Sequence, residues 1–242
     1  MALSPANYNQ ILTQVLNLAG MERDTLPTIE WKLFRDLASR RLKFAWQAAK
    51  WPEVTVTEAR TVTQSGGDEG NYVAFNQPTE TEIGEVFAVW NKSPKSNKDQ
   101  VSLTWYLSEN GIQIAESNTT AYIWFRKTVP VLTGDLYSTS TVYAAGDQVY
   151  DNAAGQFYVA NQSVAAGSNS PTDQPSYWDL TSIPMIFFDY LVRGTYSDYL
   201  RHNGELDRAR VAEADARDVI DHELLKLHTQ QGQTTQIEVA GY

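Results

Sequence analysis

Residues 188–227 read FDYLVRGTYSDYLRHNGELDRARVAEADARDVIDHELLKL and contain two helical patterns with a stop signal between them. Large apolar side chains recur at three- and four-residue intervals from Phe187 to Leu200, which predicts a helix buried on more than one side. Asn203-Gly204 predicts a left-handed helix end. A last helix is expected from about Glu205, with Glu213, Arg217 and Asp221 as a charge ladder on its outside. Its alanine-rich seam indicates close packing and consists of Leu206, Ala209, Ala212, Ala216, Ile220, Leu224 and Leu227.

Two further helices are expected at the start of the chain. A Ser4-Pro5 start signal and a stop at Gly20 bracket the first apolar helical pattern. The second helix is predicted from about Pro27 to Lys50 and ends at Trp51-Pro52, because proline disfavours the helical conformation in the residue before it. This helix is basic, so we expect the acidic last helix as its neighbour. Its core face is expected to carry Ile29, Leu33, Leu37 and Phe44, widened by Phe34, Leu42 and Trp46.

From Val54 the apolar pattern alternates with a period of two, which is typical of strands. Clusters of glycine, asparagine, proline and serine separate the strand candidates, and this favours an antiparallel sandwich or small barrel. The stretch 136–182 continues with strands and loops, and its composition differs because it has four aspartates and no lysine or arginine. The strand candidates after Val54 and Val56 are residues 61–63, 72–75, 83–90, 100–106, 111–114 and 121–126.

The sequence therefore predicts an α+β protein, in which the N- and C-terminal segments form a four-helix bundle and a long antiparallel β insertion separates them. Residues 1–53 and 183–242 are expected to form the bundle and a C-terminal arm. Residues 54–135 are expected to form an antiparallel β domain, and residues 136–182 a separate β insertion.

Composition narrows the functional classes. At 42% hydrophobic and 12% aromatic residues, the chain can bury a core, and its formal charge of −10 argues against a groove that grips phosphates. The absence of cysteine excludes disulfides and thiolate metal sites. No signal peptide and no membrane-spanning run is expected, so the sequence favours a soluble protein.

Few residues suggest catalysis. Asp218 and His222 share a helix face and could form part of a metal site, but the sequence places no third ligand, so a solvated face is the favoured interpretation. Glu80, Glu82 and Glu85 could supply a general acid and base, but a hydrated acidic loop is favoured for them. Neither a phosphate-binding loop nor a nucleophile elbow occurs. We therefore expect no enzyme activity, no cofactor and no metal.

The sharpest local motif lies in the stretch 136–182. The chain reads YAAGDQV at 143–149 and GQFYVA at 155–160, followed by Gly167, Pro171 and Trp178. This order resembles the small chitin-binding type of carbohydrate-binding module. The resemblance implies that Tyr143, Tyr158 and Trp178 either contact a glycan or fill the core of the module. Both roles stay open, because the motif continues with asparagine and glutamine at 161–162, where that family often has an aromatic pair.

The order of elements along the whole chain resembles the head-to-tail adaptor (connector) proteins of tailed bacteriophages. The features that carry the likeness are the capped first helix, the second helix closing at Trp51-Pro52, the strand 121–126 leading to Val129-Pro130, the alanine-seamed last helix and the polar tail. The resemblance implies a homo-oligomeric, dodecameric ring that docks under the portal protein, extends the DNA channel and joins the capsid to a tail or nozzle protein. Such a protein is located in the virion neck and is assembled in the bacterial cytoplasm.

The C-terminal arm is the expected portal-binding segment. Its alternation of apolar and polar residues suits the addition of a strand to a partner, and the residues concerned are Gln236, Ile237, Glu238, Val239 and Tyr242. The acidic chain is expected to let genomic DNA pass without sequence-specific binding. The alternative function is a glycan-binding virion decoration or receptor-binding protein.

Overall fold

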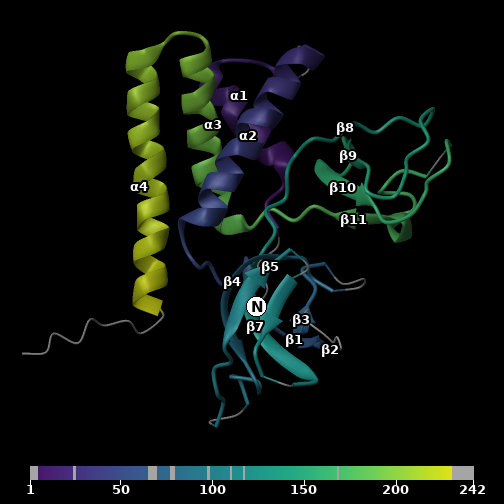
Figure 1. Ribbon diagram of the computed structural model, residues 1–242. Coiled ribbons are helices and arrows are strands. Elements are labelled where there is room, and N and C mark those ends of the chain that lie inside the picture. The colour runs from purple at the N-terminus through teal and green to yellow at the C-terminus, as the bar shows by residue number, and fades with distance from the viewer. Residues whose placement is uncertain are drawn as a thin grey trace, which may run out of the picture. The chain divides into compact units, whose positions relative to one another are not determined.

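The protein is described here by a computed structural model that covers residues 5–23, 26–64, 70–76, 80–96, 99–109, 111–116, 118–167 and 169–230 (Figure 1). Over these residues it has four α-helices and three β-sheets, which confirms the predicted α+β class. None of the described helices is both long enough and apolar enough to cross a membrane. The α-helices are α1 (Tyr8–Ala19), α2 (Thr28–Ala48), α3 (Phe188–His202) and α4 (Leu206–Gln230).

The chain divides into two compact units, and residues Lys50–Val129 form one of them. This unit has a three-stranded sheet in the order β1-β7-β4 and a four-stranded sheet in the order β2-β3-β6-β5, and every strand pair in both is antiparallel. The strands are β1 (Thr55–Thr61), β2 (Thr63–Gln64), β3 (Asn71–Val73), β4 (Ile83–Trp90), β5 (Trp105–Ser108), β6 (Gly111–Ile114) and β7 (Thr120–Lys127).

Alternation along β7 explains the core of this unit. Ala121, Ile123 and Phe125 are buried, whereas the residues between them are half-buried on the other face. Gly111 sits where β6 approaches β3, with φ of 146°, and a Cβ there would lie 2.1 Å from the carbonyl oxygen of Val73. Only glycine fits this crossing.

The other unit comprises Met1–Ala49 and Pro130–Tyr242 and contains all four α-helices. Helix α3 packs against α1, α2 and α4, so the prediction that it is buried on more than one side is confirmed. Phe34 of α2 lies against Tyr199 of α3, with ring centroids 4.8 Å apart. On another side of α3, Leu200 packs against Ala209 and Ala212 of α4. The alanine seam therefore lets α4 approach α3 closely.

Helix α1 begins later than its predicted start signal. Asn7 is the N-cap residue, and its side-chain Oδ1 accepts a hydrogen bond of 2.8 Å from the backbone N–H of Asn9. Pro5 precedes the helix, and Ser4 lies outside the described residues, so the Ser4-Pro5 signal is wrong. Asparagine is as good an N-cap as serine, and the sequence alone did not rank the two. The predicted stop is confirmed, because Gly20 is left-handed with φ of 69°.

The predicted core face of α2 is wrong at its two ends. Ile29 is 79% exposed and Phe44 is 62% exposed. Helix α2 carries large apolar side chains on two faces, and Ala38 lies on the face that is buried. Small residues on that face let a helix approach its neighbours closely, and periodicity alone does not reveal which of two apolar faces packs. The prediction is confirmed for Phe34, Leu37, Leu42 and Trp46, which are buried. The buried apolar residues of the helix are Trp31, Phe34, Leu37, Ala38, Leu42, Ala45 and Trp46.

The segment predicted as a separate insertion lies in the same compact unit as the helices. Its sheet has the order β11-β10-β9-β8, with β8 and β9 parallel. An aromatic cluster fixes the sheet to α1 and α2, because the ring of Tyr8 lies 4.8 Å from Phe157 and that of Trp31 lies 5.3 Å from Tyr150. The elements are β8 (Asp135–Leu136), β9 (Gln148–Asp151), β10 (Gln156–Ala160) and β11 (Trp178–Leu180), with short 3₁₀ turns η2 (Pro175–Tyr177) and η3 (Met185–Phe187).

The β9–β10 turn touches the start of α1. The carbonyl oxygen of Gly155 accepts a hydrogen bond of 3.0 Å from the N–H of Asn9, and Asn7 Nδ2 donates to the carbonyl oxygen of Ala154 at 3.0 Å. Gly155 has φ of 70°, and a Cβ there would lie 2.6 Å from the Cβ of Asn9. The helix cap and the turn thus constrain each other.

Substitution Gly155→Ala tests this contact. We expect it to lower the free energy of unfolding by about 2–4 kcal/mol, because it adds a clash with the side chains of Asn9 and Asn7 to the strain of a left-handed alanine. Gly146→Ala is the matched control, since Gly146 has φ of 94° but open space around its Cβ position. The control should lose only about 1 kcal/mol in urea unfolding. Equal losses in the two variants would contradict a tight contact between turn and helix.

Candidate functional site

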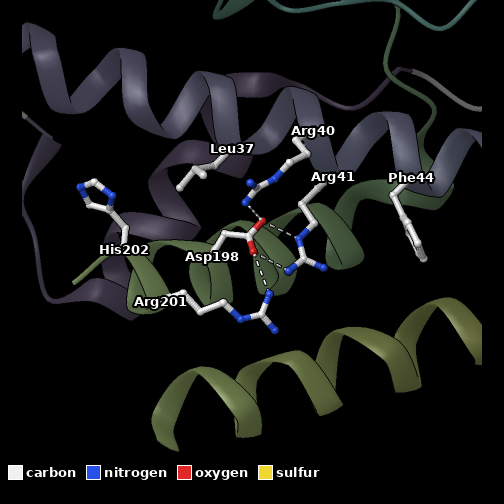
Figure 2. Close-up of a pocket in the computed structure, with 7 residues that line it drawn as sticks. All are labelled: Leu37, Arg40, Arg41, Phe44, Asp198, Arg201 and His202. Carbon is white, nitrogen blue, oxygen red and sulfur yellow. Dashed lines mark hydrogen bonds and ion pairs between the residues drawn. The ribbon is translucent and has the colours of Figure 1, made fainter. Parts of the chain in front are cut away.

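Arg41 lies at the centre of an ion-pair cluster that joins three helices. From α2, its Nε and one terminal nitrogen donate to the two carboxylate oxygens of Asp198 on α3, each at 2.7 Å (Figure 2). The same terminal nitrogen donates to Glu213 on α4 at 2.5 Å. A two-bond fork of this kind is the strongest geometry for an arginine–carboxylate pair and fixes both side chains.

Two more arginines surround Asp198. Arg40 reaches it at 2.8 Å and Arg201 at 3.2 Å, as the dashed lines in Figure 2 show. Gly194, one turn before Asp198, makes room for the arginine stem, because a Cβ at this position would lie 3.0 Å from the Cδ of Arg41. The buried carboxylate of Asp198 is therefore paired with three arginines.

The electrostatics of the cluster follow from burial and charge together. Burial alone would raise the pKa of Asp198, but hydrogen bonds from Arg41 and Arg40 and their charges outweigh it, so the pKa lies below its ordinary value. The pKa of Glu213 is lowered in the same way, against burial, by Arg41 and Arg201. Both carboxylates are therefore ionised at neutral pH, and the cluster holds its full charge.

A pocket of about 550 Å³ opens beside this cluster, between α2 and α3. Its lining combines an apolar wall with three guanidinium groups and one carboxylate, so its formal charge is positive. Such a site can bind an anionic group or a carboxylate side chain. The lining residues are Leu37, Arg40, Arg41, Phe44, Asp198, Arg201 and His202 (Figure 2).

Sequence reasoning missed this cluster, although one signal was present. Asp198 follows Leu191 and Gly194 along the apolar stripe of its helix, at a position that faces the core. A carboxylate at a core position indicates a buried cationic partner. The predicted outer charge ladder is also corrected here, because Glu213 turns inward to Arg41, and its contact with Arg217 is longer, at 3.4 Å.

The aromatic residues of the carbohydrate-module motif lie inside the β8–β11 region. Tyr143 and Trp178 are buried with their rings 5.5 Å apart, and Tyr158 is half-buried against the same cluster. The Trp178 Nε1 donates to the carbonyl oxygen of Asn169 at 2.9 Å. Asn161 is exposed at the position where an aromatic residue is frequent in that family. Tyr143 and Trp178 therefore lie in the core of this region, and Tyr158 lies at its edge.

The weaker chemical candidates are dispersed. Asp218 and His222 are both exposed on α4, and the described residues contain no cluster of three or more potential metal-ligating side chains. In the other unit, Glu80 is paired with the fully buried Arg60, and Glu85 with Arg126. Glu82 is exposed. These three glutamates therefore do not form a shared acid–base site.

The expected portal-binding residues Gln236, Ile237, Glu238, Val239 and Tyr242 lie outside the described residues. The site that the structure describes is therefore the arginine–carboxylate cluster and the pocket beside it.

The charge cluster makes a pH-dependent contribution to stability. Because the folded pKa of Asp198 is lowered, its stabilising effect is present above the unfolded pKa of about 4 and is lost as pH falls through the folded value. Asp198→Asn should lower the free energy of unfolding at pH 7 by about 3 kcal/mol, since Arg41 loses the more buried of its two carboxylate partners. The variant should also show a shallower fall in stability between about pH 5 and pH 2.

Asp215→Asn is the control for this variant, because Asp215 forms only an exposed pair with Arg193 at 3.4 Å. It should change stability by less than about 1 kcal/mol and leave the acid limb unchanged. If the stability of Asp198→Asn falls between about pH 5 and pH 2 as steeply as that of the wild type, the cluster does not cause the pH dependence. Urea unfolding at a series of pH values measures both.

No protein-family model and no curated protein matches this chain. Its role must therefore be inferred from its own residues: a helical unit tied by a buried arginine cluster, a β sheet fixed to two of the helices, and a chain that is acidic as a whole.

Proposed function

We propose that the protein is a head-to-tail adaptor of a tailed-phage virion, in which a ring of copies docks under the portal protein and extends the DNA channel toward a tail or nozzle protein. The observation that carries the proposal is the order of elements. Two helices, a long β region and two further helices follow one another, and α3 packs against α1, α2 and α4. In this proposal the four helices act as one bundle with the β region inserted between its halves.

The charge cluster suits such a role. A ring under internal DNA pressure needs subunits that do not deform, and Arg41 ties three helices together through Asp198 and Glu213. The sheet of the segment 130–182 is fixed to the same unit by the aromatic cluster around Tyr8 and Phe157. Both features support a rigid building block.

The alternative function, a glycan-binding decoration, has less support. Sugar rings stack on exposed aromatic faces, whereas Tyr143 is 9% exposed and Trp178 is 4% exposed. In the proposed adaptor these residues are the core of an inserted framework. A glycan array that shows saturable binding, lost in Tyr158→Ala, would favour the alternative.

The adaptor proposal is tested by co-purification with the portal protein of the same virion. The full chain should form a stoichiometric complex with the portal ring, measured as mass by native mass spectrometry. Deletion of residues 231–242 leaves every described element intact and should abolish the complex. The control is Ile237→Leu with Val239→Leu, which keeps the apolar pattern and should retain binding. The proposal is contradicted if the full chain forms no complex with the portal protein.

A second expectation concerns DNA. With a formal charge of −10, the free protein should not retard duplex DNA in a gel at roughly 50 mM salt, where phosphate contacts are strongest. Retardation that weakens steeply as salt increases would contradict a channel that lets DNA slide.

A further inference from the structure

The outer face of α2 is exposed and mixed in character. Phe44 is 62% exposed, and the side chains of Arg40 and Asp36 are 65% and 61% exposed. Leu33, which is half-buried, lies on the same face. Positions 33, 36, 40 and 44 follow the three- and four-residue spacing of a helix-packing stripe. Two of these side chains also contact α3, because the Phe44 ring lies 6.2 Å from that of Tyr190 and Arg40 pairs with Asp198 at 2.8 Å. Helix α2 thus presents a second stripe, which borders the α2–α3 pocket and is exposed along its outer edge.

Helix α4 has a comparable second stripe. Its buried residues Ala209, Ala212 and Ala216 face α3, and the opposite side is exposed. There Leu225 is 64% exposed and the side chain of Arg217 is 72% exposed. The positions of this second stripe are Ala214, Arg217, Asp221 and Leu225, all of them exposed.

The two stripes match in one register. With Phe44 set opposite Leu225 in a parallel alignment, Arg40 falls opposite Asp221. In the same alignment Asp36 falls opposite Arg217, and Leu33 falls opposite Ala214. Two apolar pairs and two pairs of opposite charge therefore coincide over three helical turns, about 16 Å. Helix α2 contributes the arginine to one charge pair and the aspartate to the other. A shift by one helical turn would therefore place like charges opposite each other.

The helix directions fit this register. Figure 1 shows α2 and α4 running the same way, both opposite to α3. In a cyclic ring whose axis follows the helices, each copy keeps its helix directions, so α2 of one copy and α4 of the next are parallel. The two stripes belong to different helices, so a contact between them joins two different surfaces, as a head-to-tail contact between copies requires.

We infer that the outer face of α2 in one copy binds the outer face of α4 in a second copy, with Phe44 against Leu225 and Arg40 against Asp221. This inference deepens the proposed ring by naming its contact, and it rests on that proposal only for ring closure. The occupant is a second copy of this chain because the two faces complement each other in both apolar pattern and charge.

Cysteine cross-linking tests the contact, since the chain has no cysteine of its own. Phe44→Cys and Leu225→Cys are made on separate chains, mixed with and without the portal protein, and oxidised. Because each chain carries one cysteine, a bond between 44 and 225 must join two copies. Ile29→Cys mixed with Leu225→Cys is the control, since position 29 is even more exposed than position 44 but lies about 22 Å away from it along the helix.

The expected result is at least about tenfold more cross-linked dimer for the 44–225 pair than for the 29–225 pair, because a disulfide needs Cα atoms within about 7 Å. Adding Asp221→Arg to the Leu225→Cys chain should suppress the cross-link, whereas Asp207→Arg, the same charge change outside the stripe, should not. A 44–225 yield no higher than the control, in the presence and absence of portal, overturns the inference.

The two proposals fail separately. If the 44–225 cross-link forms but the chain does not bind the portal protein, this contact is supported and the adaptor function is contradicted. A portal complex without the cross-link leaves the adaptor function standing and overturns the contact.

Discussion

The guanidinium of Arg41 is held between three helices, and its charge is stable there because Asp198 and Glu213 both accept hydrogen bonds from it. A buried ion pair of this kind contributes little net stability relative to apolar packing, but removing one partner is costly. Its main consequence is geometric. The fork on Asp198 sets how α2 lies against α3, and the contact with Glu213 sets where α4 lies.

The position of Arg41 also explains which face of α2 is free. With the stripe of Phe34 and Ala38 turned inward and Arg41 reaching across Gly194, Phe44 lies at the edge of the α2–α3 contact, where it stacks on Tyr190 and remains largely exposed. The alanine seam of α4 has the parallel effect, because it packs on α3 and leaves Leu225 exposed. Internal packing thus produces two outward stripes on flanking helices, and these are the surfaces that a ring of copies can use.

The periodicity of apolar residues was sufficient to predict the helices and strands, but it did not show which face of each helix is buried. The helices at both ends, the stops at Gly20 and Gly204 and most strands of residues 55–127 were predictable, because each depends on a local pattern or a backbone conformation that glycine favours. Which face of α2 is buried was not, since both faces carry large apolar residues and the choice depends on partners distant in sequence.

The candidate site shows the same division. Asp198 on an apolar stripe indicated a buried partner, but sequence spacing could not identify Arg41, which lies far away in the chain. Composition marked residues 136–182 as distinct, yet the aromatic contacts of Tyr150 and Phe157 that fix them to the helices depend on tertiary packing. The motif residues Tyr143 and Trp178 were recognisable from the sequence, but their burial became visible only in the structure.

The central claim is that copies of this chain assemble side by side as a ring on the portal. An electron cryomicroscopy map of the portal protein with this chain bound tests it most directly. The account predicts a closed ring in which α2 of each copy runs parallel to α4 of its neighbour, with density joining Phe44 to Leu225. A map in which the chain binds as isolated copies, or in which the outer face of α4 faces solvent all round the ring, would contradict it.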